Sequence, residues 1–117
     1  MNLGFSNASP EKLYIPTDDK PNSPTVEDQM KDPNSLYYEV KKLIALRREH
    51  SALLSDGDIE FVSDGADGSP LAYIRSSADE KILVVVNPAD REAVLNVPGD
   101  WKETLYEIGG AVVVEDG

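Results

Sequence analysis

The residues of this sequence that could perform chemistry are its acidic side chains, one histidine and a few aromatic rings. With 22 Asp and Glu residues, some pair of carboxylates will always look like the acid and the nucleophile of a glycosidase. That chemistry requires two carboxyl groups at a defined separation across a sugar-binding cleft. Nearly all the acids here lie in expected turns or on the outside of an expected helix, where solvation explains them. We therefore assign no catalytic residue.

The only histidine, His50, stands at the expected end of a helix, beside Arg48 and Glu49. A catalytic histidine needs a partner that orients it or accepts its proton, and the sequence identifies none. We interpret His50 as a surface residue that opposes the negative end of the helix dipole.

The stretch Asp64-Gly-Ala-Asp-Gly68 invites a calcium-binding interpretation, because calcium takes carboxylate and carbonyl oxygens on a turning backbone. The alternating acidic positions and the distal glutamate of the familiar calcium loop are absent. We expect a plain turn, since Asp and Gly are the residues that turns use. The sequence also has no Ser-His-Asp arrangement, no phosphate loop and no clustered metal ligands, so we expect no metal ion and no cofactor.

A sugar-binding module would stack exposed aromatic rings on the face of a pyranose. The available rings are Phe61, Tyr73, Trp101 and Tyr106. On strands such rings more often serve packing. The substrate-binding residues are therefore unknown, and a carbohydrate-binding module stays open as an alternative.

The first segment expected to position these groups, residues 1–31, reads as a long loop. It holds four prolines, and proline removes a hydrogen-bond donor and pushes its predecessor out of the helical region. Thr25 followed by Asp28 could cap about one helical turn. Apolar residues such as Leu3 and Phe5 favour an ordered loop over a solvated tail.

Residues 32–54 are expected to form one amphipathic helix. Asp32 is a candidate N-cap with Pro33 at the first helical position, and Asn34 and Ser35 are alternative caps. The apolar residues with helical spacing are Leu36, Val40, Leu43 and Ile44, and the face is widened by Tyr37, Ala45 and Leu46. An exposed face of this breadth favours association.

From Ile59 onward the pattern changes to short β-branched and aromatic runs separated by Gly, Asp and Pro. The six candidate strands are residues 59–63, 71–76, 81–87, 93–97, 103–108 and 111–114. Their short connections predict antiparallel pairing, and the wholly apolar residues 82–86 predict a central strand. The expected fold class is mainly β: an antiparallel sheet or sandwich, preceded by a long loop and one amphipathic α-helix.

The composition limits the partners of the protein. A hydrophobic content of 40% predicts a folded chain, and a net charge of −11 argues against nucleic acid and membrane surfaces as partners. No stretch approaches the roughly 20 apolar residues of a membrane span, and the N-terminus lacks the order of a signal peptide. The absence of cysteine is neutral between compartments. A cytoplasmic location is the default, with secretion of a longer parent left open.

Several segments resemble glycoside hydrolase family 13. The end of the family's barrel is matched by Asn2-Leu-Gly-Phe-Ser6, by Leu13-Tyr-Ile-Pro16, and by Asp32-Pro-Asn-Ser-Leu36 running into Lys42-Leu-Ile-Ala-Leu-Arg-Arg-Glu-His50. Two strands of the family's C-terminal β-domain are matched by Pro70-Leu-Ala-Tyr-Ile-Arg75 and Lys81-Ile-Leu-Val-Val-Val-Asn-Pro88. The similarity is to the oligo-1,6-glucosidase and α-glucosidase members, with trehalose synthase as an alternative parent.

The resemblance implies a parent that is a retaining α-glycosidase, whose catalytic TIM barrel carries the nucleophilic Asp and the acid Glu upstream of this chain. It makes residues 1–31 similar to the loop after the eighth barrel strand and residues 32–54 similar to the eighth helix. Residues 58–117 are then the family's C-terminal domain, an antiparallel β-sandwich of Greek-key type, which stops at Asp116-Gly117 without the closing strand. Gly4 and Phe5 match the loop pattern, with no sugar contact assigned to them.

On this interpretation the chain is a non-catalytic C-terminal fragment, and its β-domain stabilises the barrel of the parent. The expected partners are that barrel and, for the parent, α-glucan oligosaccharides. We expect the isolated helix either to fold onto the sheet or to pair with a second copy. Alternatives from other classes are the carbohydrate-binding module and a calcium-dependent adhesive domain.

Overall fold

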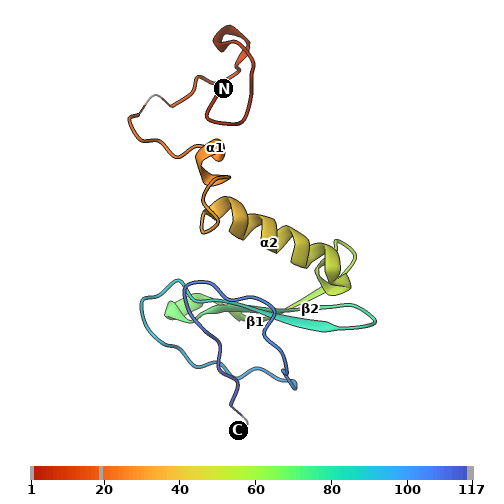
Figure 1. Cartoon of the computed structure of the whole chain (residues 1–117). Coiled ribbons are helices and arrows are strands. Elements are labelled where there is room, and N and C mark those ends of the chain that lie inside the picture. Colours follow the sequence, from red (N-terminus) through yellow and green to blue (C-terminus); the bar gives the residue numbers. More distant parts are fainter. Residues whose placement is uncertain (1, 19, 116–117) are drawn as a thin grey trace. The chain divides into compact units, whose positions relative to one another are not determined.

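The structure is a computed structural model that describes residues 2–18 and 20–115 (Figure 1). The chain divides into two compact units between Ala45 and Leu46, and each is described by itself. Asp116 and Gly117, where the β-domain is expected to stop short of a closing strand, lie outside the described residues.

The first unit is largely irregular before its helices. Its early elements are the 3-10 turn η1 (Pro10–Lys12) and the one-turn helix α1 (Val26–Gln29). The Thr25 hydroxyl accepts a hydrogen bond from the Asp28 N–H at 3.0 Å and donates to the Asp28 carboxylate at 2.7 Å. The predicted cap at Thr25 is confirmed.

The long helix α2 (Leu36–Glu49) is shorter at both ends than the predicted residues 32–54. After it, the backbone of His50 is extended, and a 3-10 turn, η2 (Ser51–Leu53), follows. No helix within residues 2–18 and 20–115 has the length and apolar character to cross a bilayer.

The N-terminal end of α2 is capped from a distance. Asp32 is not the cap, because its carboxylate accepts the N–H of Asn34 at 2.9 Å in a local turn. The N–H of Tyr37 instead donates to the side-chain oxygen of Gln29 at 3.0 Å. The hydroxyl of Ser35 donates to the Gln29 carbonyl at 2.6 Å, so α1 and the start of α2 satisfy each other's free polar groups.

The second unit contains one antiparallel sheet in the order β1-β2-β3. Its strands are β1 (Asp58–Asp64), β2 (Leu71–Ser76) and β3 (Lys81–Val86), with the 3-10 turn η3 (Ala66–Gly68) between the first two. The predicted strands 59–63, 71–76 and 81–87 are confirmed to within one residue at each end. Ala72 and Ile74 of β2 are buried, and with Ala52 of η2 they form the apolar core of the described residues.

The predicted central position of residues 82–86 was wrong. The apolar residues 82–86 belong to an edge strand, because among the described residues β3 pairs only with β2. A run of apolar residues indicates that both faces of a strand are covered. It does not indicate whether the strand has a neighbour on one edge or on both edges.

Residues 93–97, 103–108 and 111–114 are not strands in the described part of the chain. Their apolar side chains include Val94 and Val113, which are 93% and 79% exposed. Strand propensity depends on packing against cross-strand neighbours, and these segments have no ladder partner in the sheet. Figure 1 shows them as loops beside the sheet.

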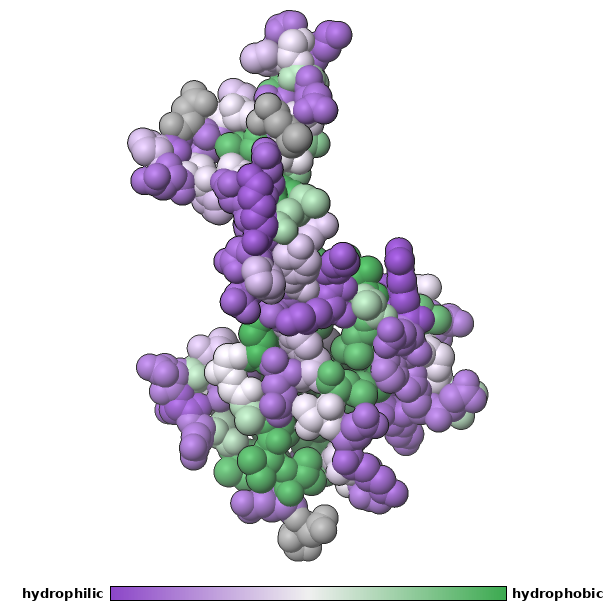
Figure 2. Space-filling view, viewed as in Figure 1, coloured by the Kyte–Doolittle hydropathy of each residue, from purple (hydrophilic) through white to green (hydrophobic). Residues whose placement is uncertain are grey.

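The architecture is therefore mainly β, with one antiparallel sheet and one helix of substantial length, consistent with a β-sandwich C-terminal domain. Figure 2 shows apolar residues exposed on the viewed face of the sheet-containing unit.

Candidate functional site

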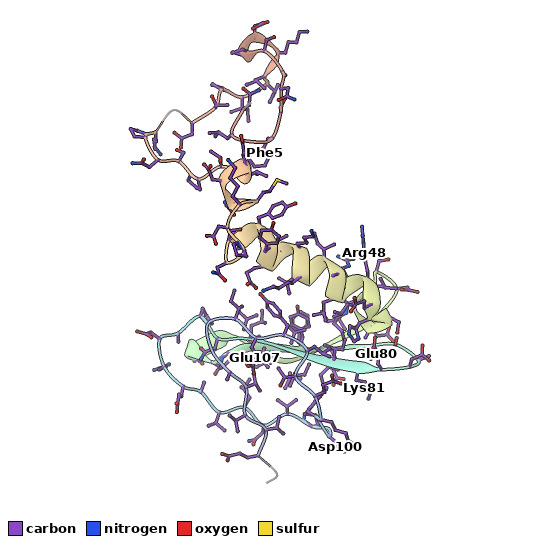
Figure 3. All side chains as sticks on the ribbon, viewed as in Figure 1. Phe5, Arg48, Glu80, Lys81, Asp100 and Glu107 are labelled. Atoms are coloured by element: carbon purple, nitrogen blue, oxygen red, sulfur yellow. The ribbon has the colours of Figure 1, made fainter. Side chains whose placement is uncertain are left out.

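The residues that follow α2 meet the turn between β2 and β3 in a cluster of hydrogen bonds. We call it the His50–Glu80 clip, and it consists of His50, Ser51, Ala52, Ser77 and Glu80. The Nδ1 atom of His50 lies 2.8 Å from Oε2 of Glu80, and the N–H of Ala52 donates to Oε1 of Glu80 at 3.1 Å. The side chains of His50 and Glu80 are 22% and 28% exposed. Figure 3 labels Glu80 at this end of the sheet.

Hydrogen bonds within the β2–β3 turn hold Glu80 in contact with η2. The N–H of Ser77 donates to the carbonyl of Glu80 at 3.0 Å and closes the hairpin next to the Ser76–Lys81 pair. The Ser77 hydroxyl lies 2.7 Å from the Ser51 hydroxyl, which is also 3.4 Å from the Glu80 carboxylate. The turn and η2 are therefore joined by two side chains of the turn.

The electrostatics of the clip favour an ionised carboxylate. The hydrogen bond from His50 lowers the pKa of Glu80, and the Ala52 N–H lowers it further, while partial burial opposes both. The expectation that His50 has no identifiable partner was wrong. Its partner lies 30 residues away, and no local pattern in the sequence marks that pair.

Arg75 of β2 holds the segment after η2. Its guanidinium donates to the carbonyls of Leu54 at 2.6 Å and Gly57 at 3.3 Å, and its Nε donates to the carbonyl of Asp58 at 3.2 Å. A Cβ on Gly57 would lie 2.5 Å from the carbonyl oxygen of Ala52, so this turn requires glycine. The chain from His50 to Asp58 is thus bound to the sheet at two places, by Glu80 of the β2–β3 turn and by Arg75 of β2.

A hollow of about 540 Å³ opens beside the clip, and its lining includes Glu60, Lys81 and Trp101. The indole N–H of Trp101 is buried without a hydrogen-bond partner among the described residues. The ring also packs closely on Gly99, where a Cβ would approach it to 3.2 Å. Trp101 therefore serves local packing while it lines the hollow.

The other candidate aromatic residues are not gathered at the hollow. Phe61 and Tyr73 pair across β1 and β2 with ring centroids 5.8 Å apart, and Phe61 is 63% exposed. Tyr106 is half-buried in the irregular segment after β3. No platform of several stacked rings is assembled by these four residues.

The segment Asp64 to Gly68 forms a turn. The Asp64 carboxylate accepts the N–H of Ala66 at 2.9 Å, and Gly65 and Asp67 have φ angles of 77° and 54°. Within residues 2–18 and 20–115, no group of three or more His, Asp or Glu side chains is arranged to hold a metal ion.

Gly4 and Phe5 lie in the loop before α1. A Cβ on Gly4, whose φ is 91°, would lie 2.7 Å from the N atom of Glu27, and the Leu3 carbonyl accepts the N–H of Val26 at 2.9 Å. Gly4 thus permits the loop to lie directly against the start of α1. Phe5 is 79% exposed and is labelled in Figure 3.

Comparison with known proteins assigns the chain to a family. The model of the family described as Maltogenic Amylase, C-terminal domain, matches residues 59–114. The chain is 36% identical over 106 residues to a glucan 1,6-α-glucosidase of Streptococcus pneumoniae serotype 4, covering 91% of this chain and 19% of that protein. This chain is a C-terminal part of an α-amylase-family protein. The resemblance to glycoside hydrolase family 13 is confirmed.

Other relatives of this α-amylase-family chain have related names. It is 36% identical over 84 residues to an oligo-1,6-glucosidase of Halalkalibacterium halodurans, covering 72% of this chain and 14% of that protein. It is 35% identical over 94 residues to a trehalose synthase of Pimelobacter sp., covering 74% of this chain and 16% of that protein. The chain spans about a fifth of the length of the curated relatives it matches. No solved structure matches it significantly.

Proposed function

We propose that this chain is the non-catalytic C-terminal portion of a glycoside hydrolase that acts on α-glucosidic bonds. In this proposal residues 58–117 form the β-domain that stabilises a catalytic TIM barrel. Residues 1–31 are the loop after the last barrel strand, and residues 32–54 form the last barrel segment, which includes α2. Trehalose synthase is the alternative parent.

The observation that carries the proposal is the extent of the similarity. The alignment with the glucan 1,6-α-glucosidase covers 91% of this chain, whereas the C-terminal domain model covers only residues 59–114. A free-standing β-module would share only the β-domain with such an enzyme. The shared loop and helix support a chain that continues from a barrel.

The surface of α2 supports the same proposal. Leu36, Val40, Leu43 and Ile44 follow one helical face and are 67%, 46%, 44% and 50% exposed. A surface helix normally buries such a face against a core. In this proposal the apolar face of α2 packs against the barrel of the longer protein. Whether the isolated helix instead folds onto the sheet or pairs with a second copy stays a prediction for light scattering.

The chemistry of the described acids supports a catalytic centre outside this chain. Glycoside hydrolysis needs two carboxyl groups facing one sugar-binding cleft. Glu80 already accepts bonds from His50 and Ala52, and Asp64 accepts a bond from its own turn. The substrates of the longer protein are proposed to be α-glucan oligosaccharides, in keeping with the names of the glucosidase relatives.

A carbohydrate-binding module is the alternative, because Trp101 lines a hollow and its indole N–H has no partner among the described residues. Trp101 is the only tryptophan, so its fluorescence reports the hollow directly. Under the leading proposal, a pure sample neither hydrolyses maltose, isomaltose or nitrophenyl glucosides nor changes its fluorescence with malto-oligosaccharides. Turnover would contradict the non-catalytic assignment, and a saturable fluorescence change would favour the binding module.

A further inference from the structure

Glu80 joins two segments of the second unit through a single carboxylate. One oxygen faces His50 Nδ1 at 2.8 Å, and the other accepts the Ala52 N–H at 3.1 Å. Ala52 is fully buried in η2. The same carboxylate therefore binds the residue before η2 and the buried residue within it.

Both carboxylate oxygens must accept for this arrangement to hold. An ionised carboxylate accepts at both oxygens, whereas a protonated carboxyl has one O–H that needs an acceptor of its own. Within the clip the nearest hydroxyl is that of Ser51, 3.4 Å from Glu80 and already 2.7 Å from the Ser77 hydroxyl. Protonation of Glu80 therefore leaves its O–H without a free acceptor in the clip. It also removes the negative charge that strengthens the hydrogen bonds of Glu80 to His50 and Ala52.

Other ionisable groups surround the clip. The hollow beside it is lined by charged residues from β1, β3 and the segment after β3: Glu60, Lys81, Asp100, Lys102 and Glu103. Lys102 pairs with Asp100 at 3.3 Å, and Asp79 lies in the same turn as Glu80. Lys81, Asp100, Lys102, Glu103, Glu60 and Asp79 are all exposed, so salt screens their effect on Glu80.

We propose that Glu80 is a proton-controlled latch, which holds η2 on the β2–β3 hairpin when ionised and releases it when protonated. Release frees the Ala52 N–H and the His50 ring while the strand ladder between β2 and β3 stays paired. The latch rests only on contacts within the second unit. It therefore does not depend on the proposed function, which concerns a barrel outside this chain.

The direction in which the stability of the latch changes with pH follows from the lowered pKa of the Glu80 carboxyl. The pKa of Glu80 is lowered in the folded protein from an ordinary value of 4.5, so the latch contributes its full stability above pH 4.5. That contribution is lost as the pH falls through the folded pKa.

Hydrogen exchange at the Ala52 amide tests the latch, with rates corrected for the intrinsic pH dependence of exchange. At pH 7, Glu80→Gln should lower the protection of Ala52 roughly fivefold and leave the hairpin amides unchanged. Wild-type protection should fall toward that of the variant below pH 4.5. Glu103→Gln, which changes an exposed acid of the same hollow, should follow the wild type. Equal protection of wild type and Glu80→Gln at pH 7, or a gap that persists below the pH at which the Glu80 carboxyl is seen to titrate, would overturn the proposal.

A second measurement needs no variant and covers the case in which Glu80→Gln does not fold. Carboxyl chemical shifts of the wild-type protein, followed by NMR during an acid titration, should show Glu80 titrating below the ordinary pKa value of 4.5. The amide shift of Ala52 should move with the same midpoint as Glu80. A Glu80 midpoint at or above pH 4.5, or an Ala52 amide that does not respond, would equally reject the latch.

Discussion

Gly57 shows how one residue determines the turn from η2 to β1. A Cβ at this position would lie 2.5 Å from the Ala52 carbonyl oxygen and 3.1 Å from the Arg75 guanidinium. We predict that Gly57→Ala lowers the free energy of unfolding by about 1 to 3 kcal/mol, because the backbone must move to admit a methyl group. Urea denaturation followed by circular dichroism measures the change.

Gly110 supplies the matched control for Gly57. A Cβ on Gly110 would meet no heavy atom within 4 Å. Gly110→Ala should change the unfolding free energy by no more than about 0.5 kcal/mol. If the two substitutions had equal effects, close approach at Gly57 would not be the cause.

At single residues, the sequence predicted contacts that are local and missed those that are distant. The bond between Thr25 and Asp28 spans three residues and follows a known capping pattern. The bond between His50 and Glu80 spans 30 residues and depends on the hairpin that brings Glu80 to η2. Nothing in the neighbours of His50 in the sequence distinguishes Glu80 from the other acids.

Among the elements, the start of α2 depends on a side chain from the preceding helix. Gln29 of α1 accepts the Tyr37 N–H, which otherwise has no partner within α2. We predict that Gln29→Ala destabilises the first turn of α2 by about 0.5 to 1.5 kcal/mol and reduces the helical signal in far-UV circular dichroism. Glu27→Ala changes an exposed residue of the same short helix and should have little effect. An equal loss in both variants would show that Gln29 does not cap α2.

Element boundaries followed the sequence where the signal is periodic. The three strands of the sheet were predicted to within one residue at each end, because apolar and β-branched runs bounded by turn residues mark strands. The apolar spacing also predicted the helix, but α2 is shorter at both ends than residues 32–54. The predicted N-cap at Asp32 was wrong, because α2 begins at Leu36. The residue directly before it is Ser35, one of the alternative caps, whose carbonyl accepts the Glu39 N–H at 3.3 Å, while Gln29 accepts the Tyr37 N–H at 3.0 Å. The strands predicted after residue 87 were wrong because propensity alone does not supply a partner strand.

At the scale of the whole molecule, many large apolar side chains of the described residues are exposed. Besides the face of α2, large apolar residues such as Ile59, Phe61 and Ile108 are 53%, 63% and 64% exposed. Extended apolar surface of this kind marks sites of interaction. In our proposal the catalytic barrel of the longer protein is the partner that covers it.

The central claim is that the apolar face of α2 packs against the barrel. The most direct test compares Leu43→Asp with Ala45→Asp in the longer protein, where this chain is joined to the barrel. Leu43 is 44% exposed on the apolar face. Ala45, which the sequence pattern placed on the widened face, is exposed and lies two residues after Leu43, so in α2 it is on the opposite side of the helix. Leu43→Asp should lower the free energy of unfolding by about 2 to 4 kcal/mol, because it places an unpaired charge in a packed interface. Ala45→Asp should cost no more than about 0.7 kcal/mol, its loss of helix propensity. Equal effects of the two substitutions would contradict the account.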